Sequence, residues 1–201
     1  MCVLLTCCFP SLQYVDKTFV MATELHPTTD VAAIGGMDNM TTIFDMSPSL
    51  PTGTQKRALT GSGPDGSLTM GHDGYVASLA FMPGDPTKLV SAGGDGDAIL
   101  WDWERGEVIR KFYGHVGDAN SIRFPKENPG STFVTASTDK TCRVWDPRTN
   151  SKDKEMADSV SCFEASGECN GAAYFPAGTA VAACCHDGAA FLWDLRTTNQ
   201  L

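Results

Sequence analysis

Short apolar or alternating runs follow one another along much of the chain. The runs "YVASLAF", "KLVSA", "AILWD" and "EVIRKFY" occupy residues 75–81, 88–92, 98–102 and 107–113. They are too short for the apolar stripe of a helix, and Gly, Pro, Asp or Asn residues bound them. This pattern predicts successive β-strands joined by tight turns.

An aspartate stands six residues before an aromatic residue four times, and a second aspartate follows each aromatic. The four sets are Asp38, Phe44 and Asp45; Asp95, Trp101 and Asp102; Asp139, Trp145 and Asp146; and Asp187, Trp193 and Asp194. The aromatics are spaced 57, 44 and 48 residues apart. Self-similarity of this kind is the signature of a repeat architecture. We expect repeats that end near residues 45, 102, 146 and 194.

A Gly-His pair precedes two of the repeats, with His72 29 residues before Trp101 and His115 30 residues before Trp145. With the aspartate–tryptophan spacing, this resembles the WD-repeat family, whose repeats are blades of a β-propeller. The resemblance implies an all-β fold, an incomplete propeller of about four blades, each with four antiparallel strands. We expect residues 19–201 to form it and leave residues 1–18 unassigned.

In that family a histidine, a strand hydroxyl, a turn aspartate and a tryptophan form a buried hydrogen-bond network. The matching residues are His72, Ser91, Asp95 and Trp101 in one repeat, and His115, Thr135, Asp139 and Trp145 in the next. Carboxylates accept from imidazole and backbone N–H groups, and a buried indole N–H needs an acceptor. Because the set recurs, a structural role is favoured over a catalytic dyad, which would need one copy.

The first and last repeats depart from this pattern. Phe44 has no N–H to donate, Ile34 and Ala183 replace the hydroxyl residue, and Ser166 stands near the last histidine position. We expect these two blades to be less stable.

The finer sequence resembles the β subunit of heterotrimeric G proteins. Residues 19–46 look like that family's second blade, and "GGMDN" at 35–39 is the specific part of the likeness. The segments that start at Gly71, Gly114 and Phe175 are similar to its third, fourth and fifth blades.

This resemblance implies a non-catalytic signal-transduction subunit whose narrow propeller face binds the switch region of a GDP-bound α subunit, together with a γ subunit. The matching contact positions are Phe19, Met21, Met37, Asn39, Tyr75 and Asp118. Large amphipathic and flexible side chains suit a binding hot spot. The family's mode of action implies no cofactor in this chain. It implies a cytoplasmic location, at the inner face of the plasma membrane through partner subunits.

Composition agrees with a globular protein that binds other proteins. The net charge is −9 with only 15 Lys and Arg residues, which disfavours nucleic-acid binding. No run approaches the roughly 18 apolar residues of a membrane span. The chain has eight cysteines, and most of the later ones lie in strand-like stretches, which is typical of small buried hydrophobic residues in a reducing compartment.

Several features depart from the β-subunit pattern. Asn120 replaces a methionine, and residues 61–70 form an insertion beside the proposed contact face. Four repeats stand where the family has seven, and no heptad run precedes Phe19, so we expect a fragment or a truncated gene model. The charged segment at 148–158 is predicted to be a solvated loop.

Two other functions stay open. The chain is alternatively another WD-repeat scaffold, such as a ribosome-associated or ubiquitin-ligase adaptor. A propeller enzyme would need a convergent, non-repeated set of polar residues in the channel, and the sequence does not present one. "GSGPDG" at 61–66 matches a nucleotide-binding fingerprint only formally, because Pro64 disfavours the helix that must follow it.

Overall fold

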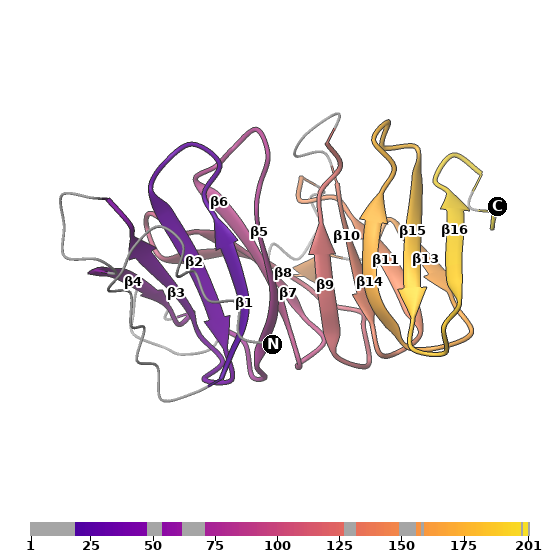
Figure 1. Ribbon diagram of the computed structural model, residues 1–201, viewed down its shortest axis with the longest axis horizontal. Coiled ribbons are helices and arrows are strands. Elements are labelled where there is room, and N and C mark those ends of the chain that lie inside the picture. Colours follow the sequence, from indigo (N-terminus) through magenta and orange to yellow (C-terminus); the bar gives the residue numbers. More distant parts are fainter. Residues whose placement is uncertain are drawn as a thin grey trace.

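The computed structural model describes residues 19–47, 54–61, 71–126, 132–148, 156–157, 159–197 and 199–200. Within them, seventeen strands form four sheets and no helix is present. The sheets stand side by side in chain order (Figure 1). The predicted all-β fold of four antiparallel, blade-like sheets is therefore confirmed.

The strands have the following bounds. Blade 1 contains β1 (Val20–Leu25), β2 (Val31–Gly36), β3 (Thr41–Asp45) and β4 (Thr54–Leu59). Blade 2 contains β5 (Val76–Phe81), β6 (Lys88–Gly93), β7 (Ala98–Asp102), β8 (Glu107–Phe112) and β12 (Met156–Ala157). Blade 3 contains β9 (Ala119–Arg123), β10 (Phe133–Ser137), β11 (Thr141–Trp145) and β13 (Ser161–Glu164). Blade 4 contains β14 (Cys169–Tyr174), β15 (Ala180–Cys185), β16 (Ala190–Asp194) and β17 (Asn199–Gln200).

Blade 2 carries a strand that the sequence pattern did not predict. Met156 and Ala157 pair in parallel with Lys111 and Phe112 of β8, so β12 becomes a fifth strand of that sheet. The sheet of blade 2 thus has five strands where four were predicted. Most of the solvated loop predicted over 148–158 lies outside the described residues, and residues 156–157 within it form β12. Open backbone groups at the outer edge of a sheet attract any extended segment that passes close by.

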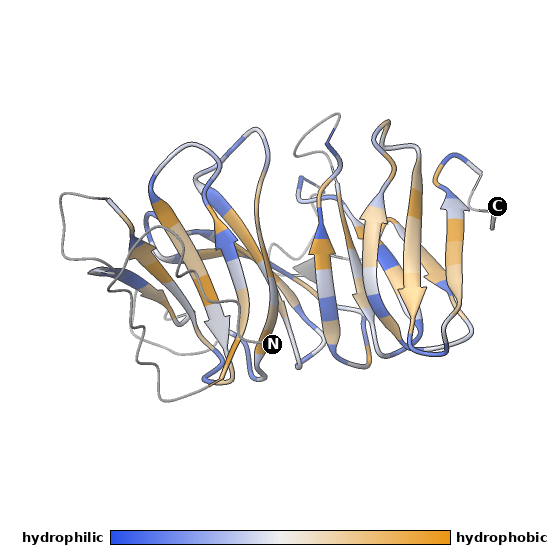
Figure 2. Ribbon diagram, viewed as in Figure 1, coloured by the Kyte–Doolittle hydropathy of each residue, from blue (hydrophilic) through white to orange (hydrophobic). Residues whose placement is uncertain are grey.

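The hydrophobic core consists of three layers, one between each pair of adjacent blades. Ile43 and Trp101 lie in the layer between blades 1 and 2, Phe112 and Phe133 between blades 2 and 3, and Val144 between blades 3 and 4. Figure 2 shows apolar residues along the strands and polar residues at many of the turns. Each blade therefore depends on its neighbour for burial, as in repeat proteins.

The four turns between the second and third strands of the blades share one geometry. The residue after the turn aspartate has a left-handed backbone in every blade: Asn39, Gly96, Lys140 and Gly188 have φ of 64°, 79°, 69° and 84°. Each aspartate also accepts a hydrogen bond from the backbone N–H two residues later, at Met40, Asp97, Thr141 and Ala189. We call the side of the array that carries these turns the turn-aspartate edge; it is the lower edge in Figure 1.

The residue two positions after the histidine of each Gly-His pair is a glycine because a side chain has no room there. A Cβ at Gly74 would lie 2.6 Å from the backbone nitrogen of Asp95, and one at Gly117 would lie 3.0 Å from that of Asp139. The segment that enters each of these blades thus lies directly against the turn of the same blade, which brings the histidine to its aspartate.

Candidate functional site

The four predicted network residues of blade 2 form one chain of hydrogen bonds. Trp101 Nε1 donates to Ser91 Oγ at 2.8 Å, and Ser91 Oγ lies 2.7 Å from His72 Nε2. His72 Nδ1 lies 2.9 Å from both carboxylate oxygens of Asp95. Asp95 also accepts from the backbone N–H of Asp73 at 2.9 Å.

The residue types determine the direction of each hydrogen bond. An indole N–H can only donate, so the serine oxygen accepts from Trp101. In the tautomer that carries its hydrogen on Nδ1, His72 Nε2 accepts the hydrogen of the serine hydroxyl. The hydrogen on Nδ1 is then available to the Asp95 carboxylate. The tautomer with its hydrogen on Nδ1 gives every group in this chain of hydrogen bonds a partner.

Blade 3 repeats the arrangement with threonine in place of serine. Trp145 Nε1 donates to Thr135 Oγ1 at 2.8 Å, His115 Nε2 lies 2.7 Å from Thr135 Oγ1, and His115 Nδ1 lies 2.9 Å from Asp139 Oδ2. Thr141 Oγ1 adds a 2.7 Å hydrogen bond to Asp139. The His115 and Asp139 side chains are almost completely buried.

Burial and hydrogen bonding shift the pKa values of this pair in a consistent way. Burial lowers the pKa of His115 below its ordinary 6.5, and this outweighs the raising effect of Asp139. Burial alone would raise the pKa of Asp139, but hydrogen bonds from Thr141 and His115 lower it to about 2. The pair is thus an ionised carboxylate beside a neutral imidazole.

Acid is expected to weaken this network through the unfolded state. His115 stays neutral in the fold, while the unfolded chain binds a proton at this residue below pH 6.5, so the free energy of unfolding falls as the pH drops through that value. Below pH 3.8 the Asp139 carboxyl adds a further loss of the same sign. Urea unfolding should therefore show a smaller stability difference between wild type and His115→Ala at pH 5 than at pH 7. An equal difference would contradict the neutral imidazole.

Blades 1 and 4 keep the turn but lack the four-residue network. In blade 4, Ser166 Oγ donates to Asp187 Oδ2 at an exposed position, and Ala183 lies on β15 without a hydroxyl. In blade 1, Ile34 and Phe44 are buried apolar residues at the hydroxyl and tryptophan positions.

The aspartate that follows each aromatic has its own local role. Asp45, Asp102, Asp146 and Asp194 accept hydrogen bonds from the backbone N–H groups of Ser47, Arg105, Arg148 and Arg196, respectively.

Five of the six predicted contact residues lie in one row that flanks the turn-aspartate edge of blades 1 to 3, and the sixth, Met21, lies near the start of β1 and also lines the inner hollow. The backbone N–H of Met37 donates to the Phe19 carbonyl at 3.0 Å, which joins the entry and the turn of blade 1. Asn39 Nδ2 donates to the Asp73 carbonyl of blade 2 at 3.3 Å. The Tyr75 hydroxyl then reaches blade 3, where it donates to Asp118 Oδ2 at 2.7 Å.

This row and Met21 present large apolar side chains to solvent. Phe19 is 76% exposed, Met37 52% and Met21 50%. The hydrogen bond to Asp118 raises the pKa of Tyr75 to about 12, so its hydroxyl stays protonated and fixed at neutral pH. Exposed apolar residues next to fixed polar groups are typical of a protein-binding surface.

Sequence reasoning missed a second contact between blades 1 and 2, away from this row. His26 Nε2 lies 3.1 Å from the Pro86 carbonyl, to which Trp103 Nε1 donates at 2.7 Å. The His26 ring also meets Phe81 edge to face, with 4.9 Å between ring centroids. Neither His26 nor Trp103 has a counterpart in the other repeats, so the repeat pattern contained no signal for them.

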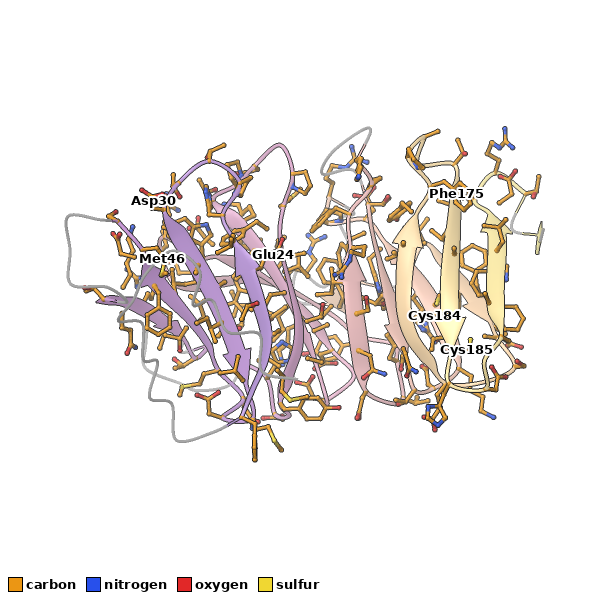
Figure 3. The ribbon with its side chains drawn as sticks, viewed as in Figure 1. Glu24, Asp30, Met46, Phe175, Cys184 and Cys185 are labelled. Atoms are coloured by element: carbon orange, nitrogen blue, oxygen red, sulfur yellow. The ribbon has the colours of Figure 1, made fainter. Side chains whose placement is uncertain are left out.

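The inner strands of the blades border a hollow of about 720 Å³. Its lining is mostly small residues, and its charged members among the described residues are Glu24 and Arg123. Glu24 projects from β1 (Figure 3). Burial raises the pKa of Glu24, and the charge of Arg123 opposes that shift.

In the described part of the chain, no group of three or more His, Cys, Asp or Glu side chains could hold a metal ion.

Some predicted features fall elsewhere. Residues 1–18 and 62–70 lie outside the described residues, so the N-terminal segment and most of the insertion do too. Asn120 donates to the Cys169 carbonyl of blade 4 at 3.3 Å. The described residues contain no apolar helix of membrane-spanning length.

Comparison with known proteins gives two kinds of match. The family model "tRNA methyltransferase TRM82 WD40 domain" matches residues 67–144, and "WD domain, G-beta repeat" matches residues 158–194. The chain is 31% identical over 188 residues to "Guanine nucleotide-binding protein subunit beta" of Nicotiana plumbaginifolia, and 30% identical over 189 residues to the protein of that name in Arabidopsis thaliana. Each alignment covers 91% of this chain and 46% of the relative, so the chain spans about half the length of these curated relatives.

Proposed function

We propose, on the premise that this chain belongs to the WD-repeat family, that it is a non-catalytic β-like subunit which binds a GDP-bound α subunit. A γ subunit would be its second partner, and the chain would act in the cytoplasm, reaching the inner face of the plasma membrane only through these subunits. The nucleotide would belong to the α subunit, so this chain would need no cofactor of its own.

The observation that carries the proposal is the single row of contact positions on the turn-aspartate edge. Phe19, Met21 and Met37 expose apolar surface on blade 1, and the Tyr75–Asp118 hydrogen bond extends the row to blade 3. A surface of this kind would bind a segment of the α subunit that is ordered in one nucleotide state of that subunit and displaced in the other. The relatives are β subunits of guanine nucleotide-binding proteins, which supports a partner of this kind.

The row divides into two kinds of residue. The aromatic and thioether side chains supply desolvated area and adapt to the partner. Asn39 and Asp118 are held by hydrogen bonds to neighbouring blades, so they present polar groups at fixed positions. When nucleotide exchange moves the partner's switch segment, it would lose both kinds of contact together, and the complex would dissociate.

Binding is expected to depend on the nucleotide and on this row. The α subunit of a heterotrimeric G protein should bind this chain when it is loaded with GDP. The same subunit loaded with a GTP analogue should bind much more weakly. Phe19→Ala or Tyr75→Ala should each weaken binding by about 1–3 kcal/mol, a roughly 5- to 150-fold rise in Kd. Calorimetry with both nucleotide states measures this directly.

Phe175→Ala is the matched control, because Phe175 is 44% exposed and lies on the opposite edge (Figure 3). It should leave Kd unchanged. Equal binding of both nucleotide states would exclude the proposal, and an equal effect of Phe19→Ala and Phe175→Ala would exclude this surface.

A second candidate function rests on the match of residues 67–144 to the tRNA methyltransferase TRM82 WD40 domain. The chain would then be a WD-repeat scaffold of another protein complex, for example a ribosome-associated or ubiquitin-ligase adaptor. Nucleotide-independent capture of a non-α-subunit partner by the same edge would favour this candidate.

A further inference from the structure

Three buried thiols meet between blades 3 and 4. Cys142 lies on β11, Cys169 begins β14 and Cys185 ends β15, and all three belong to the core layer between these blades. The interpretation of the later cysteines as buried is correct for these three and wrong for Cys162 and Cys184, which are exposed. Neither the fold nor the proposed function requires three thiols at one place.

Two of these thiols are direct cross-strand partners. Cys169 and Cys185 pair in the antiparallel ladder of β14 and β15, and their sulfur atoms lie 3.7 Å apart. Opposite residues of an antiparallel pair have Cα atoms about 4.5–5.5 Å apart, within the roughly 4.4–6.8 Å that a disulfide bridges. A bond between these two sulfurs therefore needs side-chain rotation and little backbone movement.

The surroundings give the two thiols different roles. A hydrogen bond from the Cys142 thiol lowers the pKa of Cys169, and the hydrogen bond with Cys185 acts in the same direction. Burial raises the pKa of Cys185. Burial and, to a smaller extent, the charges of Asp139 and Asp187 oppose ionisation of Cys169 but do not reverse the shift. Cys169 is thus the more readily ionised member and Cys185 the neutral thiol beside it.

We propose that Cys169 and Cys185 form a reversible disulfide when the protein meets a hydroperoxide. The Cys169 thiolate attacks one peroxide oxygen and the O–O bond breaks, which leaves a sulfenic acid on Cys169. The released hydroxide takes up a proton and becomes water. The Cys185 sulfur then attacks the Cys169 sulfur, loses its proton, and displaces the hydroxyl as a second water. Two thiols are oxidised, and one hydrogen peroxide is reduced to two waters.

The position of the pair suits a small oxidant. Cys185 lies near the turn-aspartate edge (Figure 3), two residues before Asp187 in the exposed turn of blade 4. Hydrogen peroxide is close to water in size, so local opening of that turn is sufficient for access. The same edge carries the row of contact residues on blades 1 to 3, although the disulfide does not depend on that row.

Cys184 provides a matched control within the same strand. It precedes Cys185 directly, so its side chain points to the opposite face of β15, where it is exposed and lies 3.7 Å from the Gly171 carbonyl. A reaction governed by exposure alone would oxidise Cys184 and Cys162 first. A reaction governed by pairing would join Cys169 to Cys185.

The test is disulfide mapping of the full chain after treatment with hydrogen peroxide and alkylation of the remaining thiols. Chymotrypsin cleaves after Tyr174 and so separates Cys169 from Cys184 and Cys185, and fragment ions distinguish these last two. We expect one linked pair, Cys169 with Cys185, that is lost on treatment with dithiothreitol. Cys184→Ala should leave the yield unchanged, Cys185→Ala should abolish the pair, and Cys142→Ala should slow its formation several-fold.

Either of two results would overturn the proposal. One is oxidation of Cys162 or Cys184 while Cys169 and Cys185 stay reduced in the wild-type chain. The other is a Cys169 linkage that persists in Cys185→Ala and disappears in Cys184→Ala. Because the wild-type map needs no variant to fold, a poorly folded variant does not prevent the decision.

Discussion

Replacing Asp139 by alanine is expected to lower the free energy of unfolding by about 2–4 kcal/mol. The carboxylate accepts hydrogen bonds from His115, Thr141 and the backbone N–H of Val116, and its side chain is almost fully buried. Removing it leaves the buried Nδ1–H of His115 without its acceptor, which costs more than the hydrogen bond alone is worth. Urea unfolding monitored by tryptophan fluorescence measures the change.

Asp187→Ala is the control for this prediction, because Asp187 occupies the same repeat position in blade 4. Its partner there is Ser166, and the contact is exposed, so water replaces the lost hydrogen bond. The loss should be a small fraction of that seen for Asp139→Ala. Similar losses at the two positions would show that the turn itself, and not the buried network, is what the aspartate stabilises.

Replacing Phe112 by alanine is expected to cost about 3–5 kcal/mol, because it opens a cavity between two blades. Phe112 is fully buried at the end of β8. Its ring meets Phe133 and Trp145 of blade 3 edge to face, with centroid distances of 4.9 Å and 5.8 Å. The lost contacts are thus the ones that hold blade 2 to blade 3.

Phe191→Ala gives the comparison for the core layer. Phe191 stacks on Trp193 in blade 4 but is only partly buried. Its removal should cost clearly less than that of Phe112 in the same unfolding experiment. If Phe112→Ala were no more destabilising than Phe191→Ala, the layer between blades 2 and 3 would not be a close-packed core.

The turns were predictable from the sequence because their interactions are local. An aspartate side chain reaches the backbone N–H two residues later, and this happens at all four turns. The buried networks were also visible as a pattern, because the resemblance to a known family supplied the four positions in blades 2 and 3. Spacing alone could not have named Ser91 or Thr135 as the hydroxyl that links histidine to tryptophan.

Other features depended on contacts between residues far apart in the chain. β12 is two residues long, too short to leave a periodic signal, and it exists because the edge of β8 offers open backbone groups. The contact between His26 and Trp103 depends on the packing of blade 1 against blade 2. The sequence could suggest that Phe19 and Met37 belong to one surface. Only the fold brings them together, through a 3.0 Å hydrogen bond from the backbone N–H of Met37 to the carbonyl oxygen of Phe19.

The sequence by itself thus determined the strand periodicity, the four turns and the repeat order, since each depends on residues within one repeat. The tertiary structure alone decided which side chains meet between blades. Alternation along a strand says that Cys184 and Cys185 face opposite sides, but it does not say which side a neighbouring blade covers. The packing of blade 4 on blade 3 buries Cys185 beside Cys169 and leaves Cys184 exposed, because burial is a property of the assembled blades.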